Sequence, residues 1–186
     1  MTTGRAAPEA AADLGSVLVV GGTGMLRATT CAIAHRATAL TLIARSPEAL
    51  AADLSATCPT TPIALDLTAE GAVARIAQIK GGFDTAVIWL HDDAVSLSRP
   101  LEDLLRPSAR LLRVMGSLAM DPAVRATRAP DPRQDITRQL VILGWHPDAA
   151  APDGQRWLSH AEINAGVLAA LNAPALEALI IGGSGG

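Results

Sequence analysis

A glycine cluster that follows a short apolar run is the first feature with chemical meaning. Residues 17–26 read VLVVGGTGML, so four aliphatic residues lead directly into three glycines and a threonine. Where such a turn joins a buried strand to a helix, the free amides at the helix start bind phosphate, and glycines let the phosphate reach the backbone. A simple turn is the alternative. The predicted diphosphate-binding residues are Gly21, Gly22, Thr23, Gly24, Met25 and Leu26.

The glycine pattern departs from G-x-G-x-x-G at its last position. With Gly22 and Gly24 as the first two glycines, the third place holds Arg27. The usual glycine allows the helix to pack closely on the strand. Arg27 therefore tilts the helix, points its guanidinium at a phosphate, or faces solvent, and the sequence leaves these three alternatives open.

The next two strands supply the expected adenosine-binding groups. An NAD-binding site has an acid at the end of the second strand, whereas this chain has Arg45 and Ser46 there. A guanidinium and a hydroxyl suit a 2′-phosphate, so the sequence favours NADP over NAD. An ordinary surface arginine is the alternative for Arg45. Asp66 and Leu67 end the third strand and are expected at the adenine edge, although Asp66 also suits a cap for the helix that starts near Thr68.

His91 and Asp92 follow the fourth strand and are candidates for acid–base chemistry. Imidazole is the side chain whose charge changes nearest neutral pH, and Asp92 or Asp93 is its expected carboxylate partner. The competing interpretation is that one of the two aspartates caps the following helix while His91 is a bystander. We find no clustered His, Cys, Asp or Glu at metal-ligand spacing, so no metal site is predicted.

Apolar runs that alternate with helical patterns would position these groups. Strands are predicted at 16–20, 39–44, 61–67, 83–90, 110–117 and 139–145. Helices are predicted at 25–36, 46–54, 68–80, 92–106 and 159–171, the last with the capping-box spacing of Ser159 and Glu162. This alternation predicts a doubly wound parallel α/β sheet of about six or seven strands with helices on both faces. Residues 119–138 are polar and rich in proline, and a long loop is expected there.

Composition narrows the possible partners. The formal net charge of −3 gives no indication of nucleic-acid binding, and no apolar run reaches the length of a membrane span. We expect a cytoplasmic protein with a small-molecule substrate. The predicted single domain covers residues 16–181, between a flexible start at 1–15 and a flexible tail at 182–186. Cys31 and Cys58 are expected to be buried hydrophobic residues.

Taken together, VVGGTGML, IARSPEAL, ALDLT and the fourth and fifth strands resemble the short-chain dehydrogenase/reductase superfamily, which has a Rossmann-like fold. RWLSHAEINAGVL resembles a small, atypical bacterial branch of it. The resemblance spans residues 17–171 and implies three further roles. Trp89 matches the turn beside the cofactor ribose, Ser117 the catalytic serine, and Leu143-Gly144 the turn that faces the nicotinamide. Ser117 is then expected to orient a substrate oxygen or nitrogen, and a plain strand-end turn is the alternative.

The resemblance fails at the proton donor. The superfamily uses a Tyr-x-x-x-Lys helix, but this chain has no tyrosine, and its single lysine, Lys80, lies in another crossover. We expect an NADP-dependent reductase of a small carbonyl or imine, because an iminium already bears its charge and needs chiefly a hydride. A dinucleotide-binding regulator and an isomerase or cyclase on the same scaffold are the alternatives. Related folds pair through helices, so a homodimer through Leu101, Leu104 and Leu105 is expected.

Overall fold

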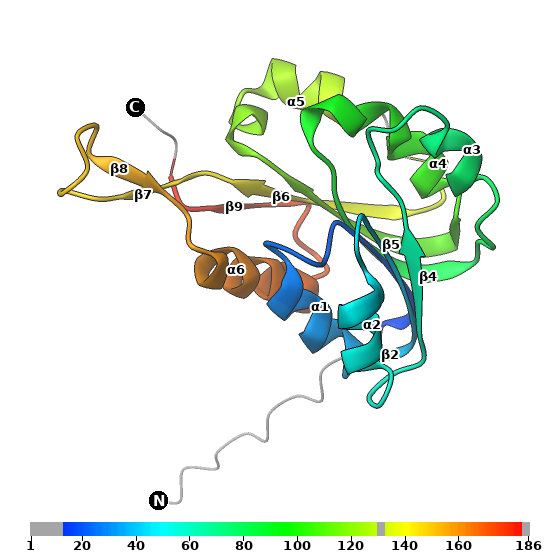
Figure 1. The fold of residues 1–186 in the computed structure, drawn as a ribbon. Coiled ribbons are helices and arrows are strands. Elements are labelled where there is room, and N and C mark those ends of the chain that lie inside the picture. Colours follow the sequence, from blue (N-terminus) through cyan, green and yellow to red (C-terminus); the bar gives the residue numbers. More distant parts are fainter. Residues whose placement is uncertain (1–12, 130–132, 184–186) are drawn as a thin grey trace, which may run out of the picture.

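One parallel sheet organises the molecule. The structure is a computed structural model that describes residues 13–129 and 133–183. Seven strands pair in parallel in the order β3-β2-β1-β4-β5-β6-β9 (Figure 1). They are β1 (Gly15–Val20), β2 (Ala37–Ala44), β3 (Thr60–Ala64), β4 (Phe83–Trp89), β5 (Leu105–Met115), β6 (Thr137–Leu143) and β9 (Ala178–Ile181). The predicted doubly wound sheet is confirmed, and its order reverses between β1 and β4.

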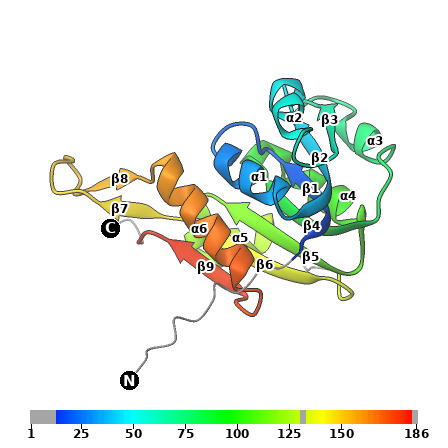
Figure 2. The same ribbon diagram turned by 90° about the horizontal axis from the view of Figure 1, so that it is seen from below.

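Helices cover both faces of the sheet (Figures 1 and 2). The first face carries α1 (Arg27–Ala34), α2 (Glu48–Leu54) and α6 (His160–Asn172). The second face carries α3 (Ala72–Ile76), α4 (Ser98–Glu102), α5 (Pro122–Arg128) and the 3-10 helices η1 (Asp92–Leu97) and η2 (Ser117–Met120). Val17 and Val19 of β1 pack on the first face, and Leu18 and Val20 on the second. Burial on both sides explains why this strand is apolar without interruption.

The last crossover places α6 on an unexpected face. The β4–α4–β5 and β6–α6–β9 connections step in the same direction along the sheet, yet α4 packs on the second face and α6 on the first. The two crossovers therefore have opposite hands, whereas parallel crossovers are almost always right-handed. This arrangement brings α6 against α1, beside the glycine turn.

The crossover after β5 is not the long loop that was expected at 119–138. It holds η2 and then α5, whose N-cap Asp121 accepts a hydrogen bond from the Ala123 amide at 2.8 Å. Pro122 begins the helix, where a missing amide proton costs nothing. The proline and the charged residues here therefore belong to a short exposed helix. Residues 130–132 lie outside the described part of the chain.

Two of the expected helix starts are displaced. Ser46 does not cap α2, which begins at Glu48 after Pro47. The helix expected from Thr68 begins only at Ala72. By contrast, the Ser159–Glu162 capping box is confirmed by reciprocal hydrogen bonds at the start of α6.

A small antiparallel hairpin, not foreseen from the sequence, leaves the end of β6. It consists of β7 (Trp145–Pro147) and β8 (Gln155–Trp157) and projects from the body of the molecule (Figure 1). Gly183 exchanges two backbone hydrogen bonds with Trp145, at 2.7 and 3.0 Å. The ordered chain therefore continues past residue 181, and residues 184–186 lie outside the described part.

The face that was expected to form a dimer is not available. Leu101, Leu104 and Leu105 are all buried within the chain's own core, beneath the second face of the sheet. Leu101 lies in α4, Leu104 follows that helix and Leu105 begins β5, so their spacing reflects packing in the chain's own core. Cys58 is buried as expected, whereas Cys31 is partly exposed.

Candidate functional site

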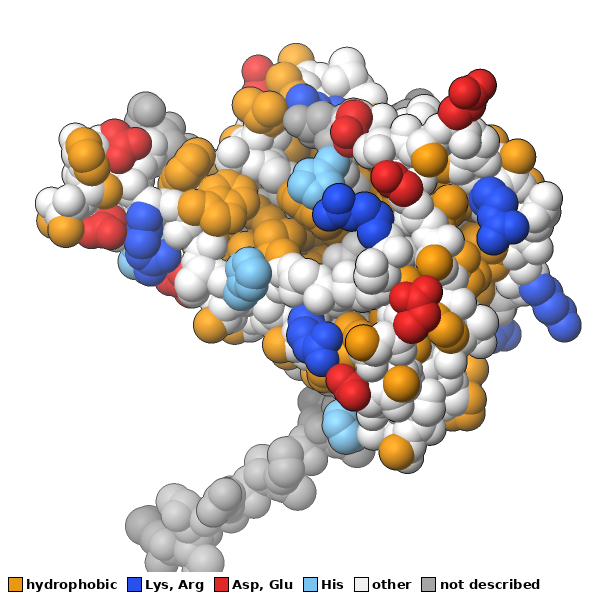
Figure 3. All heavy atoms as spheres, viewed as in Figure 1, with side chains coloured by type: hydrophobic (Ala, Val, Ile, Leu, Met, Phe, Trp, Pro, Cys, Tyr) orange, Lys and Arg blue, Asp and Glu red, His pale blue; other side chains and the backbone are white. Residues whose placement is uncertain are grey.

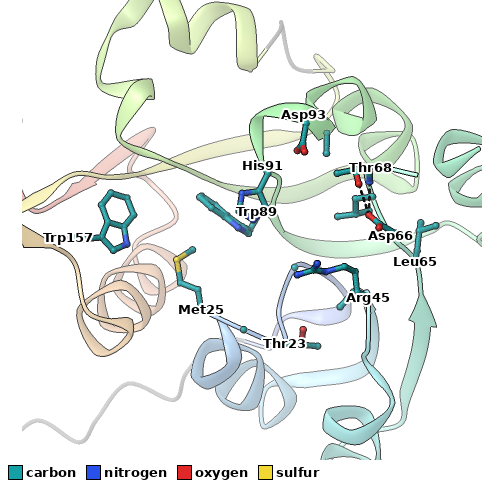
Figure 4. A pocket seen from close by; sticks show the side chains of 15 residues that line it. Thr23, Met25, Arg45, Leu65, Asp66, Thr68, Trp89, His91, Asp93 and Trp157 are labelled. Carbon is teal, nitrogen blue, oxygen red and sulfur yellow. Dashed lines mark hydrogen bonds between the residues drawn. The ribbon is translucent and has the colours of Figure 1, made fainter. Parts of the chain in front are cut away.

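A cavity of about 640 Å³ opens at the carboxyl ends of β1, β2, β3 and β4 (Figure 4). This is the edge at which parallel α/β sheets bind ligands, beside the point where strand order reverses. Its size lies within the ordinary range for small-molecule sites. The lining residues are Gly21, Thr23, Gly24, Met25, Ala44, Arg45, Leu65, Asp66, Leu67, Thr68, Trp89, His91, Asp93, Ala94 and Trp157.

The glycine turn forms the floor of this cavity. Gly21 has φ +74°, and a Cβ there would lie 2.8 Å from the Trp89 carbonyl oxygen, so only glycine fits. A Cβ on Gly24 would meet no atom within 4 Å. The space above Gly24 is therefore open to a ligand, and the absence of a side chain lets that ligand reach the backbone.

Two inward side chains fix the direction of the peptide groups in this turn. The Thr30 hydroxyl donates a hydrogen bond to the Gly22 carbonyl oxygen at 2.9 Å. The side-chain amide of Asn164 donates one to the Met25 carbonyl oxygen at 2.8 Å. In a trans peptide the C=O and the following N–H point in opposite directions. The N–H groups of Thr23 and Leu26 therefore point away from these anchors, and neither donates to another residue in the described ranges. Such amides at a helix start suit an anion.

Arg45 supplies positive charge at the end of β2. Its side chain is exposed, lines the cavity and makes no hydrogen bond with the described chain. Asp66 lies nearby, and its carboxylate accepts hydrogen bonds from the Thr68 amide at 3.0 Å and hydroxyl at 2.8 Å. These bonds, with Arg45 as a smaller contribution, lower the pKa of Asp66. Asp66 thus closes a local turn and does not cap α3.

Trp89 and His91 form a wall of the cavity beside the glycine turn. Their rings meet edge to face with centroids 5.4 Å apart, and the Trp89 ring lies against Gly21. His91 makes no hydrogen bond to Asp93, which lines the same cavity, and the N-cap of η1 is His91 itself, without a side-chain hydrogen bond. The side chain of Asp92 lies outside what the structure describes. The geometry brings His91 and Asp93 to one wall without pairing them.

Several expected site residues lie away from the cavity lining. Gly22 and Leu26 are buried beneath the turn, and Ser46 is exposed beside Arg45. Ser117 begins η2, outside the lining. Leu143 is fully buried, and Gly144 is enclosed because a Cβ there would lie 2.3 Å from the Gly183 carbonyl oxygen. The chain after β9 therefore covers the turn that was expected to face a nicotinamide.

Arg27, whose direction the sequence left open, faces solvent. Its guanidinium pairs with Asp53 of α2 at 3.1 Å, and it does not line the cavity. The close packing of α1 on β1 requires a glycine at position 22 and not at position 27. A Cβ on Gly22 would lie 2.4 Å from both Thr30 Oγ1 of α1 and Val19 Cγ1 of β1.

Trp157 is the main site residue that sequence reasoning did not place in the cofactor cavity. It belongs to β8, and the hairpin carries it back over the cavity mouth. Figure 3 shows the hollow from outside, with apolar surface at its centre and basic and acidic side chains around it. Its place in this cavity follows only from the hairpin, which the sequence did not predict.

Two other site types find no support within the described residues. No group of three or more His, Cys, Asp or Glu side chains there is arranged to hold a metal ion. No helix in the same residues is long and apolar enough to cross a membrane.

Comparison with known proteins finds similarity in structure only. No family model matches the chain, and no curated protein does. A short-chain dehydrogenase from Burkholderia cenocepacia, solved with NADP, has a TM-score of 0.62 at 17% identity, over 94% of this chain and 99% of that one. The bulky-bulky ketone specific alcohol dehydrogenase from Comamonas testosteroni has a TM-score of 0.65 at 14% identity, over 90% and 86%. FolM, alternative dihydrofolate reductase 1 from Brucella suis, solved with NADP, has a TM-score of 0.63 at 14% identity, over 91% and 94%.

These similarities define the class of fold. The chain has the Rossmann-like fold of short-chain dehydrogenases/reductases, and the structures it resembles include NADP complexes. At such low identity the similarity extends to the fold alone, and the chemistry has to be argued from this chain's own residues.

Proposed function

We propose that this protein binds NADP(H) in the cavity and reduces a small carbonyl or imine compound. The observation that carries the proposal is that Arg45, which makes no hydrogen bond within the described residues, lines one cavity with the glycine turn and its free Thr23 amide. A guanidinium at the end of β2 attracts a 2′-phosphate, whereas the acid that NAD requires is missing there. The open space above Gly24 fits a diphosphate on the turn.

The redox step depends on groups other than the superfamily's tyrosine and lysine. The chain has no tyrosine, and Lys80 lies just before β4, at the edge of the sheet away from the cavity. α5 occupies the crossover after β5 but carries neither residue type. When bound, NADPH supplies a hydride. His91 and Asp93 line the cavity on the side of Trp89 and are the groups there that could move a proton.

Titration with NADPH and NADH tests the cofactor. Trp89 and Trp157 line the cavity, so a bound reduced nicotinamide is expected to quench their fluorescence. We expect NADPH to bind at least about tenfold more tightly than NADH, the equivalent of one charge-assisted hydrogen bond. If neither nucleotide changes the emission or binds by calorimetry, the proposal is wrong.

A non-redox role is the second candidate, favoured by the absence of the proton-donating tyrosine. The protein would then be a dinucleotide-binding regulator, or an isomerase or cyclase that keeps the scaffold. Transfer of deuterium from labelled NADPH to imine or ketone compounds separates the two: incorporation supports the reductase, whereas NADPH binding without any transfer favours the second role.

A further inference from the structure

One end of the cavity is an aromatic slot, defined by Met25, Trp89 and Trp157. Figure 4 shows Trp157 and Trp89 on opposite sides of a gap, with the Met25 side chain below it. Arg45 and Asp66 lie at the other end of the same cavity. The slot is therefore a separate region, beyond the part that the 2′-phosphate and diphosphate would use.

The slot is preorganised by contacts outside the cavity. Trp157 packs edge to face on Trp145, with centroids 5.2 Å apart and an interplanar angle of 76°. The neighbouring Arg156 makes a bidentate ion pair with Glu162 of α6, with both N–O distances at 2.9 Å. Its guanidinium also donates to the Trp157 carbonyl oxygen at 3.0 Å. The Trp157 ring thus keeps a partly exposed position (39%) without support from a ligand.

The charges of the lining select among ligands. Among the described residues that line the cavity, the one Arg or Lys is Arg45, which lies at the far end from Trp157. The Arg156 guanidinium beside Trp157 is paired with Glu162 and does not line the cavity, so among the described residues no unpaired guanidinium or ammonium group lines the slot. Asp93 adds a negative charge to the wall that His91 and Trp89 form. Tryptophan faces and a carboxylate together favour a cation.

We propose that the substrate is a flat iminium cation whose ring lies in the aromatic slot. This inference rests on the proposed NADPH-dependent reduction and narrows its substrate class. An iminium carbon accepts the hydride and its two electrons from NADPH, the C=N π bond becomes the nitrogen lone pair, and the products are a neutral amine and NADP⁺. The balance requires no proton. This chemistry agrees with a chain that lacks the tyrosine proton donor.

Three bicyclic probes of similar size test the slot: N-methyl-3,4-dihydroisoquinolinium, the neutral ketone 1-tetralone, and the acid 1-naphthoate. Dissociation constants are measured by calorimetry with the NADP⁺-saturated protein and with the free protein. We expect the cation to bind about tenfold more tightly than the ketone, consistent with a cation–π contact. The acid should bind most weakly.

Variants connect this preference to the slot. Trp157→Ala should raise the dissociation constant of the cation about tenfold, whereas Trp157→Phe, which keeps an aromatic face, should change it less than about threefold. Asp93→Asn should weaken binding of the cation but not of 1-tetralone. Circular dichroism and urea unfolding of the three variants show whether each of them folds as the wild type does.

The outcomes separate the two proposals. Equal binding of the cation and the ketone, or an unchanged cation affinity in Trp157→Ala, would overturn the iminium slot even if NADPH binds. If the wild-type protein binds no NADP(H), the proposed function fails, and the cation titration of the free protein still decides whether the slot recognises cations.

Discussion

The side-chain amide of Asn164 in α6 donates a hydrogen bond to the Met25 carbonyl oxygen, at 2.8 Å, across 139 positions of sequence. The Asn164 carbonyl oxygen accepts from the Thr29 amide and hydroxyl, both at 2.7 Å. Asn164 is buried and thus connects the helix after the hairpin to the turn that would hold a diphosphate. The unusual side on which α6 packs makes this connection.

Asn164→Leu should lower both stability and cofactor affinity. The substitution leaves the Thr29 amide and the Met25 carbonyl without partners in the interior, which costs about 1–3 kcal/mol in the free energy of unfolding. Because the turn loses an anchor, the dissociation constant of NADPH should rise several-fold. Urea unfolding and NADPH titration measure the two effects. Asn172→Ala is the control, because Asn172 lies on the same helix in an exposed contact with Arg36; an unchanged NADPH affinity in Asn164→Leu would show that the anchor is only structural.

Gly24→Ala should separate binding from folding. An added Cβ meets no atom within 4 Å, so the free energy of unfolding should stay within about 1 kcal/mol of the wild type. The same methyl group stands where the diphosphate would approach, and we expect the dissociation constant of NADPH to rise about tenfold or more. Gly183→Ala, at the base of the hairpin and outside the lining, is the control. Full NADPH affinity in Gly24→Ala would place the diphosphate elsewhere.

Arg45→Leu should change the choice between cofactors. Loss of a charge-assisted hydrogen bond to the 2′-phosphate costs about 1.5–3 kcal/mol, so the dissociation constant of NADPH should rise about 10- to 100-fold while that of NADH changes little. Arg27→Gln is the matched control, since Arg27 pairs with Asp53 and does not line the cavity. A parallel loss of NADPH and NADH binding in Arg45→Leu would contradict recognition of the 2′-phosphate.

Glu162 should make the stability of the hairpin and α6 depend on pH. Hydrogen bonds from Arg156, then from Ser159, hold the pKa of the Glu162 carboxyl well below its ordinary value of 4.5. Because the folded-state pKa is depressed, the stabilisation is fully present above that ordinary value and is lost as the pH falls below it. The difference in urea unfolding between wild type and Glu162→Gln should therefore be larger at about pH 7 than at about pH 3. Glu70→Gln, at an exposed position, is the control, and a difference independent of pH would count against the carboxylate's role.

Much of the fold follows from local patterns. The fully apolar strands and their alternation with helices predicted the parallel sheet, and the carboxyl ends of β1, β2 and β4 then had to meet at one edge. The prediction thereby grouped Gly24, Arg45 and His91, which do line one cavity. Residues directly after strands are placed by the sheet itself, so their sequence positions are sufficient.

Residues that depend on distant contacts were not predictable in this way. Gly144 follows β6 just as Gly21 follows β1, yet it is enclosed because Gly183 returns to pair with Trp145. Leu101, Leu104 and Leu105 have the spacing of one helix face but are buried in the chain's own core. Periodicity shows that a face is apolar and does not identify what covers it.

The sequence by itself determined the sheet, the glycine turn and the arginine at the end of β2, because each depends on neighbours a few residues away. The tertiary structure alone decided that α6 packs on the first face, that Asn164 anchors the glycine turn, and that Trp157 closes one end of the cavity. Those contacts join residues more than 60 positions apart, and their free energy depends on shape and partners that no local pattern encodes.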